Sequence, residues 1–543
     1  MIIKFSENRV TNVIDDYRFT RYNHEDKIIY YNGNISEKIT EDFRIESYDF
    51  EEAIKDIFNA ESEKQLCDIL LRLNGKYSFI MLKDKEILWV STDIAAINRL
   101  YFYQEEGCSY IFDDFNEFKN KMNLIKNISI NKENFSFFKS KGYNPPGKTH
   151  IENLYKSIPG YIHYFHENKK DLDIMKFYNF KFEFEYETFK KIIDNQLSVS
   201  CKSYDNIYLL LSGGVDSNLL LSIMKKLNIK CIPITAKYRS EYQFASNYND
   251  IEKSKYIVNK YYKDITHKIV DVKIDKKTIV DTIKLYKKVM PFESHLAVIF
   301  RAIFEEISSE NQGKKTLVIC GQNADTLYLG PTERIQLNPF HNEFKHSIFS
   351  MIARFLLSKY FLKLKRSKRL VHWILSKVLY IGKGKRYILP QNEIEVMNYF
   401  LNSPNYLAAI EKDREISHFD KEDDFSFMQS IYLNKVRSFM DGRDPKVVYA
   451  SGQIFNIDVL LPFSTPIFVY FFYKMTYDIN YILKPKDFLY RYLKENGIDI
   501  EKINIKHNKG LLTLDEFEAK LLSLFERKEE SVQQFLGEAW NES

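Results

Sequence analysis

A glycine turn between two apolar runs constrains this chain more than any other feature of its sequence. The turn is the hexapeptide Ser-Gly-Gly-Val-Asp-Ser at 212–217, which follows the apolar run 207–211 and precedes the apolar run 219–224. The pattern predicts a buried strand that ends in the turn and a buried helix that begins directly after it. Two consecutive glycines let the backbone turn sharply and approach a ligand without an intervening Cβ.

The polar residues of the turn indicate which ligand it would take. Exposed N–H groups of a turn and of a helix N-terminus bind anions. Ser212 and Ser217 add hydroxyl donors, and the carboxylate of Asp216 suits a divalent cation. This combination suits a polyphosphate that carries magnesium, although an ordinary strand-to-helix turn is the alternative. The turn is not a P-loop, because no Lys-Ser or Lys-Thr pair follows the glycines.

The sequence from residue 186 onward predicts an α/β domain. A helix is expected before Cys201, and strands and helices then alternate. The expected strands are 207–211, 231–235, 267–272 and 316–320, and the expected helices are 217–227, 251–262, 276–290 and 297–308. Alternation of this kind predicts a doubly wound, mostly parallel sheet, which binds ligands at the carboxyl ends of its strands. The turn at 212–217 and the segment 321–325 both begin where a strand ends, so they can face one cleft.

Residues 1–185 have a β-rich pattern that predicts a separate α+β domain. Hairpins are expected for 77–82 with 87–91, for 101–103 with 110–112 and for 161–165 with 173–177. A further strand is expected at 27–31, ending at Asn32-Gly33, and helices are expected within 49–73. The domains are therefore predicted as 1–185 and 186–543, with a helical, basic insertion at 331–424. Its basic segment 347–385 is either a solvated helix face or a docking surface for an acidic partner or peptide.

Composition excludes several classes of protein. The five cysteines are scattered without a C-x-x-C pair, which argues against a disulfide framework and a zinc ribbon. The net charge of +5 gives no reason to expect nucleic acid as a partner. No apolar stretch is long enough to span a membrane and no signal peptide is evident, so a cytoplasmic protein is expected.

Several segments in a shared order resemble the asparagine synthetase family across nearly the whole chain. The turn itself is similar to the pyrophosphate loop of the ATP pyrophosphatases. The other similar segments are 73–79 (L-N-G-x-F-A-F), 92–103 (R-D…P-L-Y-Y), 142–161 (G-Y-x-P…L-P-P-G), 321–325 (G-E-G-A-D), 461–463 (V-P-F-L-D), 486–491 (K-x-L-L-R) and 506–510 (R-P-K-x-G). The nearest functional analogues within the family are the amide-forming β-lactam synthetases and lasso-peptide cyclases.

The resemblance implies an amidotransferase-like β-sandwich followed by an ATP-pyrophosphatase domain, with ATP and Mg²⁺ as cofactors. It implies that a substrate carboxylate is adenylated and then coupled to an amine. The roles it implies are pyrophosphate binding by Ser212, Gly213, Gly214 and Ser217, magnesium binding by Asp216 and Asp325, and contact with the nucleotide by Thr235. Lys486 is the expected catalytic cation, with Lys484 as a competitor, and Asp250 and Glu252 are expected near the ATP loop.

Two departures from the family pattern shape the expected chemistry. Glutamine-using members have a nucleophilic cysteine after the initiator Met, whereas this chain has Ile2 and no cysteine before Cys67. Asn32-Gly33 resembles the N-G of the family's oxyanion hole, which stabilises the intermediate formed by the nucleophilic thiol. Because that thiol is missing here, loss of glutamine hydrolysis is expected. Gln322 stands where asparagine synthetases have Glu and β-lactam synthetases have Tyr, and an amide cannot act as a base. Gln322 is expected to orient the substrate, with Glu293 or His295 as alternative bases.

Alternative functions remain open at the level of the sequence. They are an ammonia-dependent asparagine synthetase, a non-catalytic scaffold that binds ATP, and a tRNA-modifying ATP pyrophosphatase. The last is disfavoured because paired cysteines are lacking. The expected partners are a carboxylate substrate (a small, peptide or carrier-bound acid), an amine, and a precursor peptide or partner protein.

Overall fold

The structure is a computed structural model that carries side chains. It describes residues 1–14, 18–94, 97–121, 129, 131, 134, 147–149, 151–165, 169–240, 248–286, 297–311, 313–328, 381–382, 385–386, 432–433, 436–437, 440, 444–477, 481 and 486–499. The chain divides into two compact units. The first comprises Met1–Asn323, Arg437–Phe468 and Leu489–Ser543, and the second comprises Ala324–Val436 and Val469–Phe488.

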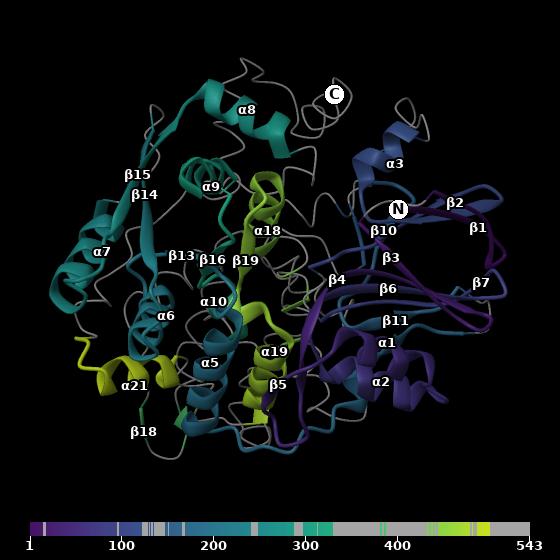
Figure 1. Cartoon of the computed structure of the whole chain (residues 1–543), viewed down its shortest axis with the longest axis horizontal. Helices are drawn as coiled ribbons and strands as arrows, with labels where there is room; N and C mark the ends of the chain where they lie inside the picture. The colour runs from purple at the N-terminus through teal and green to yellow at the C-terminus, as the bar shows by residue number, and fades with distance from the viewer. Residues whose placement is uncertain are drawn as a thin grey trace, which may run out of the picture. The chain divides into compact units, whose positions relative to one another are not determined.

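The N-terminal part of the first unit is an antiparallel sheet, as the sequence predicts (Figure 1). Its longest path runs in the order β10 (Leu154–Lys156), β8 (Tyr101–Glu105), β9 (Cys108–Phe112), β1 (Ile2–Ser6), β2 (Arg9–Ile14), β7 (Glu86–Thr92), β6 (Leu73–Lys83), β4 (Lys27–Ile39) and β3 (Thr20–His24). Off this path, β5 (Ile45–Ser47) pairs with β4, β11 (Tyr161–His163) pairs with β7, and β12 (Leu172–Asp173) pairs with β11.

This sheet folds over on itself into a β-sandwich. β2 and β7 are joined by one residue pair, Arg9 with Glu86, so the sheet can bend there. A buried cluster between the layers combines Ile3 from β1 with Ile80 from β6 and Val90 from β7. Ile2 points to the opposite face of β1 and is buried beside Phe112, because successive side chains of a strand alternate.

Helices cover the outer faces of the sandwich. α3 (Phe115–Lys121) stacks its Phe118 ring on Phe112 at 3.9 Å. On the other layer, the predicted helical segment 49–73 forms two helices, α1 (Phe50–Phe58) and α2 (Glu63–Arg72). It divides because Asp49 and Ser62 each cap a helix, accepting from Glu51 N and Gln65 N.

Two predicted strands differ from the observed ones. β4 does not end at Asn32-Gly33 but continues to Ile39, because its pairing with β6 continues past the glycine. Gly33 has φ +138°, and a Cβ there would lie 1.9 Å from the carbonyl oxygen of Lys76. The prediction of a strand at 173–177 is also wrong for the residues after Asp173. Residues Ile174–Phe177 form a 3-10 helix instead, capped by the Asp173 carboxylate at Met175 N.

The second sheet of the first unit is parallel, which confirms the predicted doubly wound class. Its order is β15 (Lys268–Ile274), β14 (Ile232–Ser240), β13 (Asn206–Leu210), β16 (Thr316–Cys320) and β19 (Asp458–Leu460), and every pairing is parallel. Strand order runs outward from β13 in both directions. The direction of winding therefore changes between β13 and β16, which is the place where such sheets bind ligands.

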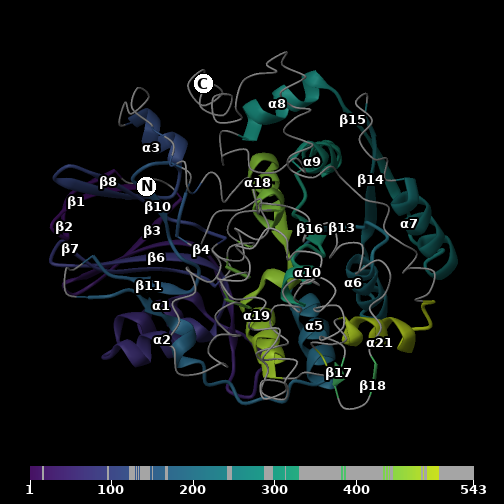
Figure 2. The ribbon, with the colours of Figure 1, turned by 180° about the vertical axis from the view of Figure 1, so that it is seen from behind.

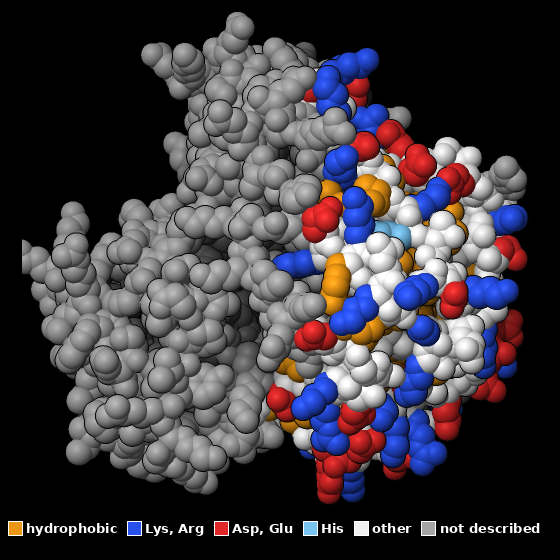
Figure 3. Space-filling view, turned by 90° about the vertical axis from the view of Figure 1, so that its left-hand side faces the viewer, with side chains coloured by type: hydrophobic (Ala, Val, Ile, Leu, Met, Phe, Trp, Pro, Cys, Tyr) orange, Lys and Arg blue, Asp and Glu red, His pale blue; other side chains and the backbone are white. Residues whose placement is uncertain are grey.

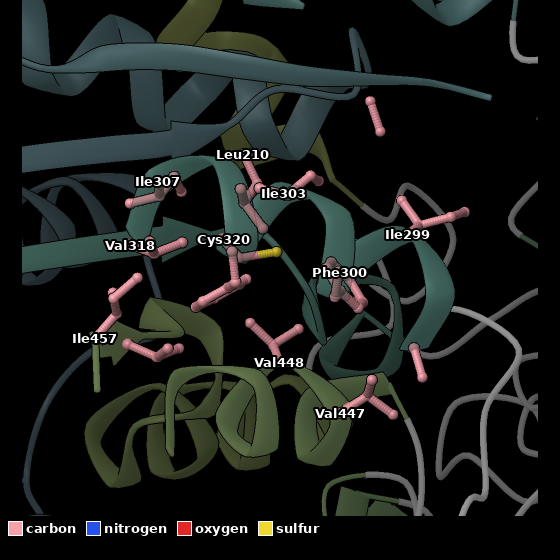
Figure 4. Close-up of a cluster of buried hydrophobic side chains, with 14 of the residues drawn as sticks. Leu210, Ile299, Phe300, Ile303, Ile307, Val318, Cys320, Val447, Val448 and Ile457 are labelled. Carbon is pink, nitrogen blue, oxygen red and sulfur yellow. The ribbon is translucent and has the colours of Figure 1, made fainter. Parts of the chain in front are cut away.

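Helices cover both faces of the parallel sheet (Figures 1 and 2). α5 (Tyr186–Ser200) and α6 (Val215–Lys226) lie on one face, and α9 (Ala297–Asn311) and α18 (Asp444–Phe455) lie on the other. Figure 4 shows the core of the second face, where Ile303 of α9, Val448 of α18 and Cys320 of β16 belong to one buried cluster. α7 (Tyr248–Tyr261) and α8 (Lys276–Tyr286) are further helices of this part. α21 (Asp487–Glu495) contacts α5, since Tyr186 Oη donates to Glu495 Oε2 at 2.7 Å.

The contacts that join the antiparallel part of the first unit to its parallel part include those of Asn74, Lys76 and Arg437. Asn74 Nδ2 donates to Glu37 Oε2 at 2.7 Å and to Gln196 Oε1 of α5 at 3.3 Å. Lys76 donates from Nζ to the carbonyl oxygen of Val459 in β19. Arg437 forms a two-point ion pair with Asp173, at 3.0 and 2.6 Å. The segment that resembles L-N-G-x-F-A-F thus supplies two of these contacts.

The described residues of the second unit form an aromatic core around α10 (Ala324–Leu327). The Tyr328 ring packs edge-on against Phe472 at 4.7 Å, and Tyr481 packs against Phe488 at 4.5 Å. α19 (Pro466–Tyr473) contributes Phe472, which contacts Tyr328, and Phe471, which contacts Phe488. Other described elements of this unit are the 3-10 helix η5 (Lys474–Tyr477) and a two-stranded sheet of β17 (Ile381–Gly382) and β18 (Lys385–Arg386).

Two further findings concern the charges on one face and the apolarity of the helices. On the face shown in Figure 3, Lys and Arg side chains are interspersed with Asp and Glu over the part that is coloured by type. Within the ranges that the structure describes, no helix combines the length and the apolarity that crossing a bilayer requires.

Replacement of Gly33 tests the continuous β4 strand. Gly33→Ala should destabilise the chain by about 3 kcal/mol, because its Cβ would meet a backbone carbonyl that cannot move without breaking the sheet. Gly107→Ala is the matched control: Gly107 has φ +79°, but no atom lies within 4 Å of the place that a Cβ would occupy. The control should lose only about 1–2 kcal/mol, the cost of a left-handed backbone. Urea unfolding measures the stability of both variants. Equal losses of stability would contradict the close approach of Gly33 to the carbonyl oxygen of Lys76.

Candidate functional site

The glycine turn lies between β13 and α6, as predicted. Gly213 has φ +76°, a left-handed conformation that favours glycine. Gly214 is the N-cap of α6 and contributes no side-chain cap, so the first N–H groups of the helix suit a ligand as their hydrogen-bond acceptor. Asp216 stands in the first turn of α6 and is half-buried.

The two serine hydroxyls are organised within the turn. Ser217 is buried, and its Oγ lies 3.2 Å from Gly214 O, to which it donates, and 3.3 Å from Ser212 Oγ. Ser212 is exposed, and its Oγ accepts from Gly214 N at 3.3 Å. The exposed Ser212 is therefore better placed than Ser217 to meet a ligand directly. The predicted role of both residues in binding pyrophosphate stays a prediction.

The segment after β16 packs directly against the start of α6. A Cβ on Gly321 would lie 3.3 Å from the backbone carbon and Cβ of Asp216 and 3.3 Å from Ser217 N. This closeness follows from the pairing of β13 with β16, in which Leu210 is opposite Cys320. Gly321 therefore lies beside the start of α6, and the cleft that 212–217 and 321–325 are expected to face stays a prediction.

Asn323 is a residue of this site that the sequence reasoning missed. It has φ +77°, and its Nδ2 donates to Phe463 O at 2.8 Å. The bond ties the segment after β16 to the segment Leu461-Pro462-Phe463 after β19, two of the stretches that carry the family resemblance. After glycine, Asn is among the residues that best tolerate a positive φ. An Asn shortly after a predicted strand was therefore the signal in the sequence for a left-handed backbone at this position. Gln322, just before it, is half-buried.

Thr235 supports the strand that leads into the turn. Its Oγ1 donates to Leu211 O at 2.6 Å and lies 2.8 Å from His267 Nε2. Because the threonine proton is used on a carbonyl, His267 must carry the proton on Nε2 and donate it. Burial, followed by the charge of Lys255, lowers the pKa of His267 to about 4, so the ring is neutral near neutral pH. The predicted contact of Thr235 with the nucleotide stays a prediction.

Within the second unit, two predicted site residues pair with one another. Lys486 Nζ lies 2.5 Å from Asp325 Oδ1, and it also lies 5.8 Å from the centre of the Tyr328 ring. The Asp325 side chain is 82% exposed and that of Lys486 is 18% exposed. An ion pair with one exposed partner is weak, so a stronger ligand can separate it at little cost.

The remaining predicted residues are placed elsewhere or lie outside the described residues. Glu252 is exposed on α7 and pairs with Lys255 at 3.5 Å, and Asp250 lies in the first turn of the same helix. Glu293, His295 and Lys484 lie outside the described residues, as do the segments 142–146 and 506–510. The predicted insertion 331–424 and its basic segment lie outside them too, apart from β17 and β18.

Four of the five thiols, those of Cys67, Cys201, Cys231 and Cys320, are in positions that do not favour nucleophilic chemistry. Cys67, Cys201 and Cys320 are buried. Burial raises the pKa of Cys67, Cys201 and Cys231 to about 12, so these three are protonated at neutral pH. At position 2 the Ile2 side chain is part of a hydrophobic cluster.

The described residues contain no group of three His, Cys, Asp or Glu side chains that could hold a metal ion. Mg²⁺ is commonly held by one or two carboxylates together with phosphate oxygens of a substrate. Asp216 beside an anion-binding turn fits that requirement, since the nucleotide would supply the other oxygens. The predicted role of Asp325 in binding magnesium stays a prediction.

Comparison with known proteins places the turn in a recognised domain. Residues 189–435 match the family model described as asparagine synthase. No curated protein sequence matches the chain. The matched segment contains the glycine turn, β13 to β16 and Asp325, and it supports an ATP-dependent, amide-forming ligase as the general class.

Solved structures with a similar fold include two synthetases. NMN synthetase from Francisella tularensis is 15% identical, with a TM-score of 0.21, and the match covers 44% of this chain and 95% of that chain. NH3-dependent NAD synthetase from Campylobacter jejuni is 16% identical, with a TM-score of 0.20, and the match covers 42% and 93%. Identities and TM-scores this low carry no information on function.

Replacement of Gly321 tests the contact with α6. Gly321→Ala should weaken binding of Mg·ATP by about tenfold, because overpacking costs about 1–2 kcal/mol and displaces the start of the helix. Gly313→Ala is the control: Gly313 has φ +80° and open space around it. That variant should lose stability but keep its nucleotide affinity in calorimetric titration. If Gly321→Ala binds Mg·ATP as tightly as the wild type, nucleotide binding does not depend on the packing of Gly321 against α6.

Replacement of His267 tests its neutral state. The folded pKa of about 4 lies below the ordinary value of 6.5, so the unfolded chain takes up the proton first as pH falls. Stability linked to His267 is therefore complete above pH 6.5 and is lost between pH 6.5 and 4. His267→Gln should lose less stability than the wild type over that range, measured by urea unfolding at several pH values. His24→Gln, at an exposed position, should behave as the wild type does.

Proposed function

We propose that this protein is an ATP-dependent ligase that adenylates a substrate carboxylate and couples it to an amine, without hydrolysing glutamine. The observation that carries the proposal is the position of the Ser-Gly-Gly-Val-Asp-Ser turn. It lies at the carboxyl end of β13, where the winding of the parallel sheet changes, with Gly321 packed against it. A polyphosphate at that place would meet N–H donors, the Ser212 hydroxyl and the Asp216 carboxylate together.

The proposed reaction proceeds in two steps. A carboxylate oxygen attacks the α-phosphorus of ATP, the bond from that phosphorus to the bridging oxygen breaks, and pyrophosphate leaves. The amine nitrogen then attacks the acyl carbon, the bond from that carbon to the phosphate oxygen breaks, and AMP leaves while the nitrogen loses a proton. Ser212, Gly213, Gly214 and Ser217 would bind the departing pyrophosphate. Asp216 and Asp325 are the residues proposed to hold magnesium, which would supply positive charge against the charge that grows on the leaving group.

Lys486 is the proposed cation for the second step. Its ammonium group would stabilise the tetrahedral oxyanion and the α-phosphate, an effect worth about 3–4 kcal/mol per donor. Within the second unit Lys486 pairs with Asp325, the residue proposed to bind magnesium, so both proposed roles fall on residues that lie together. Gln322 would orient the acyl acceptor by hydrogen bonding, and Thr235 would line the nucleotide site.

Glutamine is not the proposed source of nitrogen. The position where the family's glutamine-using members have a nucleophilic cysteine is Ile2, which is 1% exposed in a hydrophobic cluster. The amide of Asn74 and the amine of Lys76 are used in contacts with Glu37, Gln196 and Val459. The amine would thus come from the substrate itself, as in lactam closure, or from a second molecule. The acid would be a small, peptide or carrier-bound carboxylate.

Exchange of labelled pyrophosphate into ATP tests the adenylation step. The purified chain with Mg·ATP and a panel of carboxylic acids, including aspartate and peptides with free carboxylates, should show acid-dependent exchange. Asp216→Asn should reduce the exchange by about 100-fold, a loss typical of removing one electrostatic group from a reacting centre. Asp264→Asn, at an exposed turn, is the control and should retain full activity.

Three outcomes separate the alternatives. Nucleotide binding without exchange for any acid would overturn the ligase proposal in favour of an ATP-binding scaffold. Exchange only with aspartate, followed by asparagine formation from ammonium, would identify an ammonia-dependent asparagine synthetase. Release of glutamate from glutamine by the purified chain would overturn the proposed loss of glutamine hydrolysis.

A further inference from the structure

Asn218 follows the turn directly and makes side-chain hydrogen bonds that the sequence pattern does not predict. Its Nδ2 donates to Gly213 O at 3.1 Å and to Gly214 O at 2.8 Å. Its backbone N also donates to Gly214 O, at 3.1 Å, as the first hydrogen bond of α6. The side chain is 0% exposed. One buried amide therefore holds the carbonyl oxygens of both glycines of the turn.

The orientation of this amide follows from its partners. Carbonyl oxygens only accept hydrogen bonds, so the NH₂ group must face Gly213 and Gly214, and Oδ1 must point away from them. Oδ1 is buried and has no hydrogen-bond partner among the described residues. A buried acceptor without a partner costs about 1–3 kcal/mol. An apolar side chain at position 218 would pack without the free-energy cost of a buried, unpaired acceptor. Polar side chains kept at such a cost are typical of functional sites.

Peptide planarity turns these two hydrogen bonds into a constraint on the ligand-binding donors. In a trans peptide unit the C=O and the next N–H point in opposite directions. Holding Gly213 O therefore fixes the direction of the Gly214 N–H, and holding Gly214 O fixes that of the Val215 N–H. With both carbonyls held toward Asn218, both N–H groups point to the opposite side. Gly214 N–H faces the exposed Ser212 hydroxyl on that side.

We propose that Asn218 is a positioning residue that holds the Gly214 and Val215 N–H groups toward the phosphates of the nucleotide. The inference rests on the proposed function. Without the amide, the peptide unit between the two glycines can rotate, because glycine backbone is permissive. A rotated unit would present a carbonyl oxygen to the phosphate in place of an N–H donor. Binding of the phosphates would be lost while contacts with the nucleoside would remain.

Three variants test the proposal. Asn218→Asp keeps the shape of the side chain but places a carboxylate oxygen where the NH₂ group stood, next to two carbonyls. Asn218→Ser keeps one short donor, which can reach the carbonyl four residues back. Thr282→Val is the control: Thr282 is also fully buried in a helix, and its hydroxyl donates to Thr278 O at 2.6 Å. It lies on α8, outside the turn and both of its flanking elements.

Three ligands give the discriminating measurement: Mg·ATP, magnesium pyrophosphate and adenosine, each titrated by calorimetry. In Asn218→Asp, affinity for the two phosphate ligands should fall by at least about tenfold, the effect of losing one hydrogen-bonded donor, with adenosine affinity unchanged. Asn218→Ser should show an intermediate affinity for the two phosphate ligands. It replaces Asn218→Asp as the test if that variant does not fold. Thr282→Val should bind all three ligands as the wild type does.

The outcomes also separate this inference from the proposed function. Equal loss of affinity for all three ligands, or lowered thermal stability with unchanged affinities, would reduce Asn218 to a structural residue and overturn the inference. Failure of the wild type to bind Mg·ATP at all would instead overturn the proposed function. In the exchange assay, the expected signature is a raised KM for ATP with a smaller change in kcat.

Discussion

The absence of a side chain at Gly321 is the constraint on which the site depends. Neighbouring parallel strands lie only about 4.8 Å apart, so the segments that leave β13 and β16 compete for the same space. Gly321 passes within contact distance of Asp216 and Ser217, where a Cβ would press on the start of α6. The first turn of the helix is thereby backed by polypeptide and not by solvent. A fixed backing of this kind lets the N–H groups of the turn act as a preorganised anion site.

Asparagine side chains stabilise the irregular backbone around this contact. Asn218 holds the carbonyls of Gly213 and Gly214, and Asn323 donates to Phe463 O. Backbone polar groups that leave a sheet or helix need other partners when they are buried. An amide side chain serves this purpose because it is short, uncharged and able to donate twice. The turn after β13 is held in shape in this way, and the segments after β16 and β19 are tied together.

The antiparallel part of the first unit is a β-sandwich whose polar residues support the contact with the parallel part. Asn74, Lys76 and Asp173 each make a contact with α5, β19 or Arg437. Burial lowers the pKa of Lys76 to about 8, so keeping its ammonium group there costs free energy. Side chains committed in this way are consistent with the proposed ligase, in which the sandwich is a structural partner.

The sequence by itself determined the two kinds of sheet, the hairpin β6–β7, the helices α5, α6 and α9, and the turn at 212–217. These features follow from hydrophobic periodicity and from glycines, which act between residues close together in the chain. Tertiary structure decided the order β14–β13–β16, the continuation of β4 through Gly33 and the 3-10 helix after Asp173. It also decided the bonds of Asn218, Asn323 and His267 and the ion pair of Lys486 with Asp325. These depend mostly on partners that are distant in sequence, or on peptide directions set by packing, and no local pattern encodes which distant carbonyl or carboxylate will be within reach.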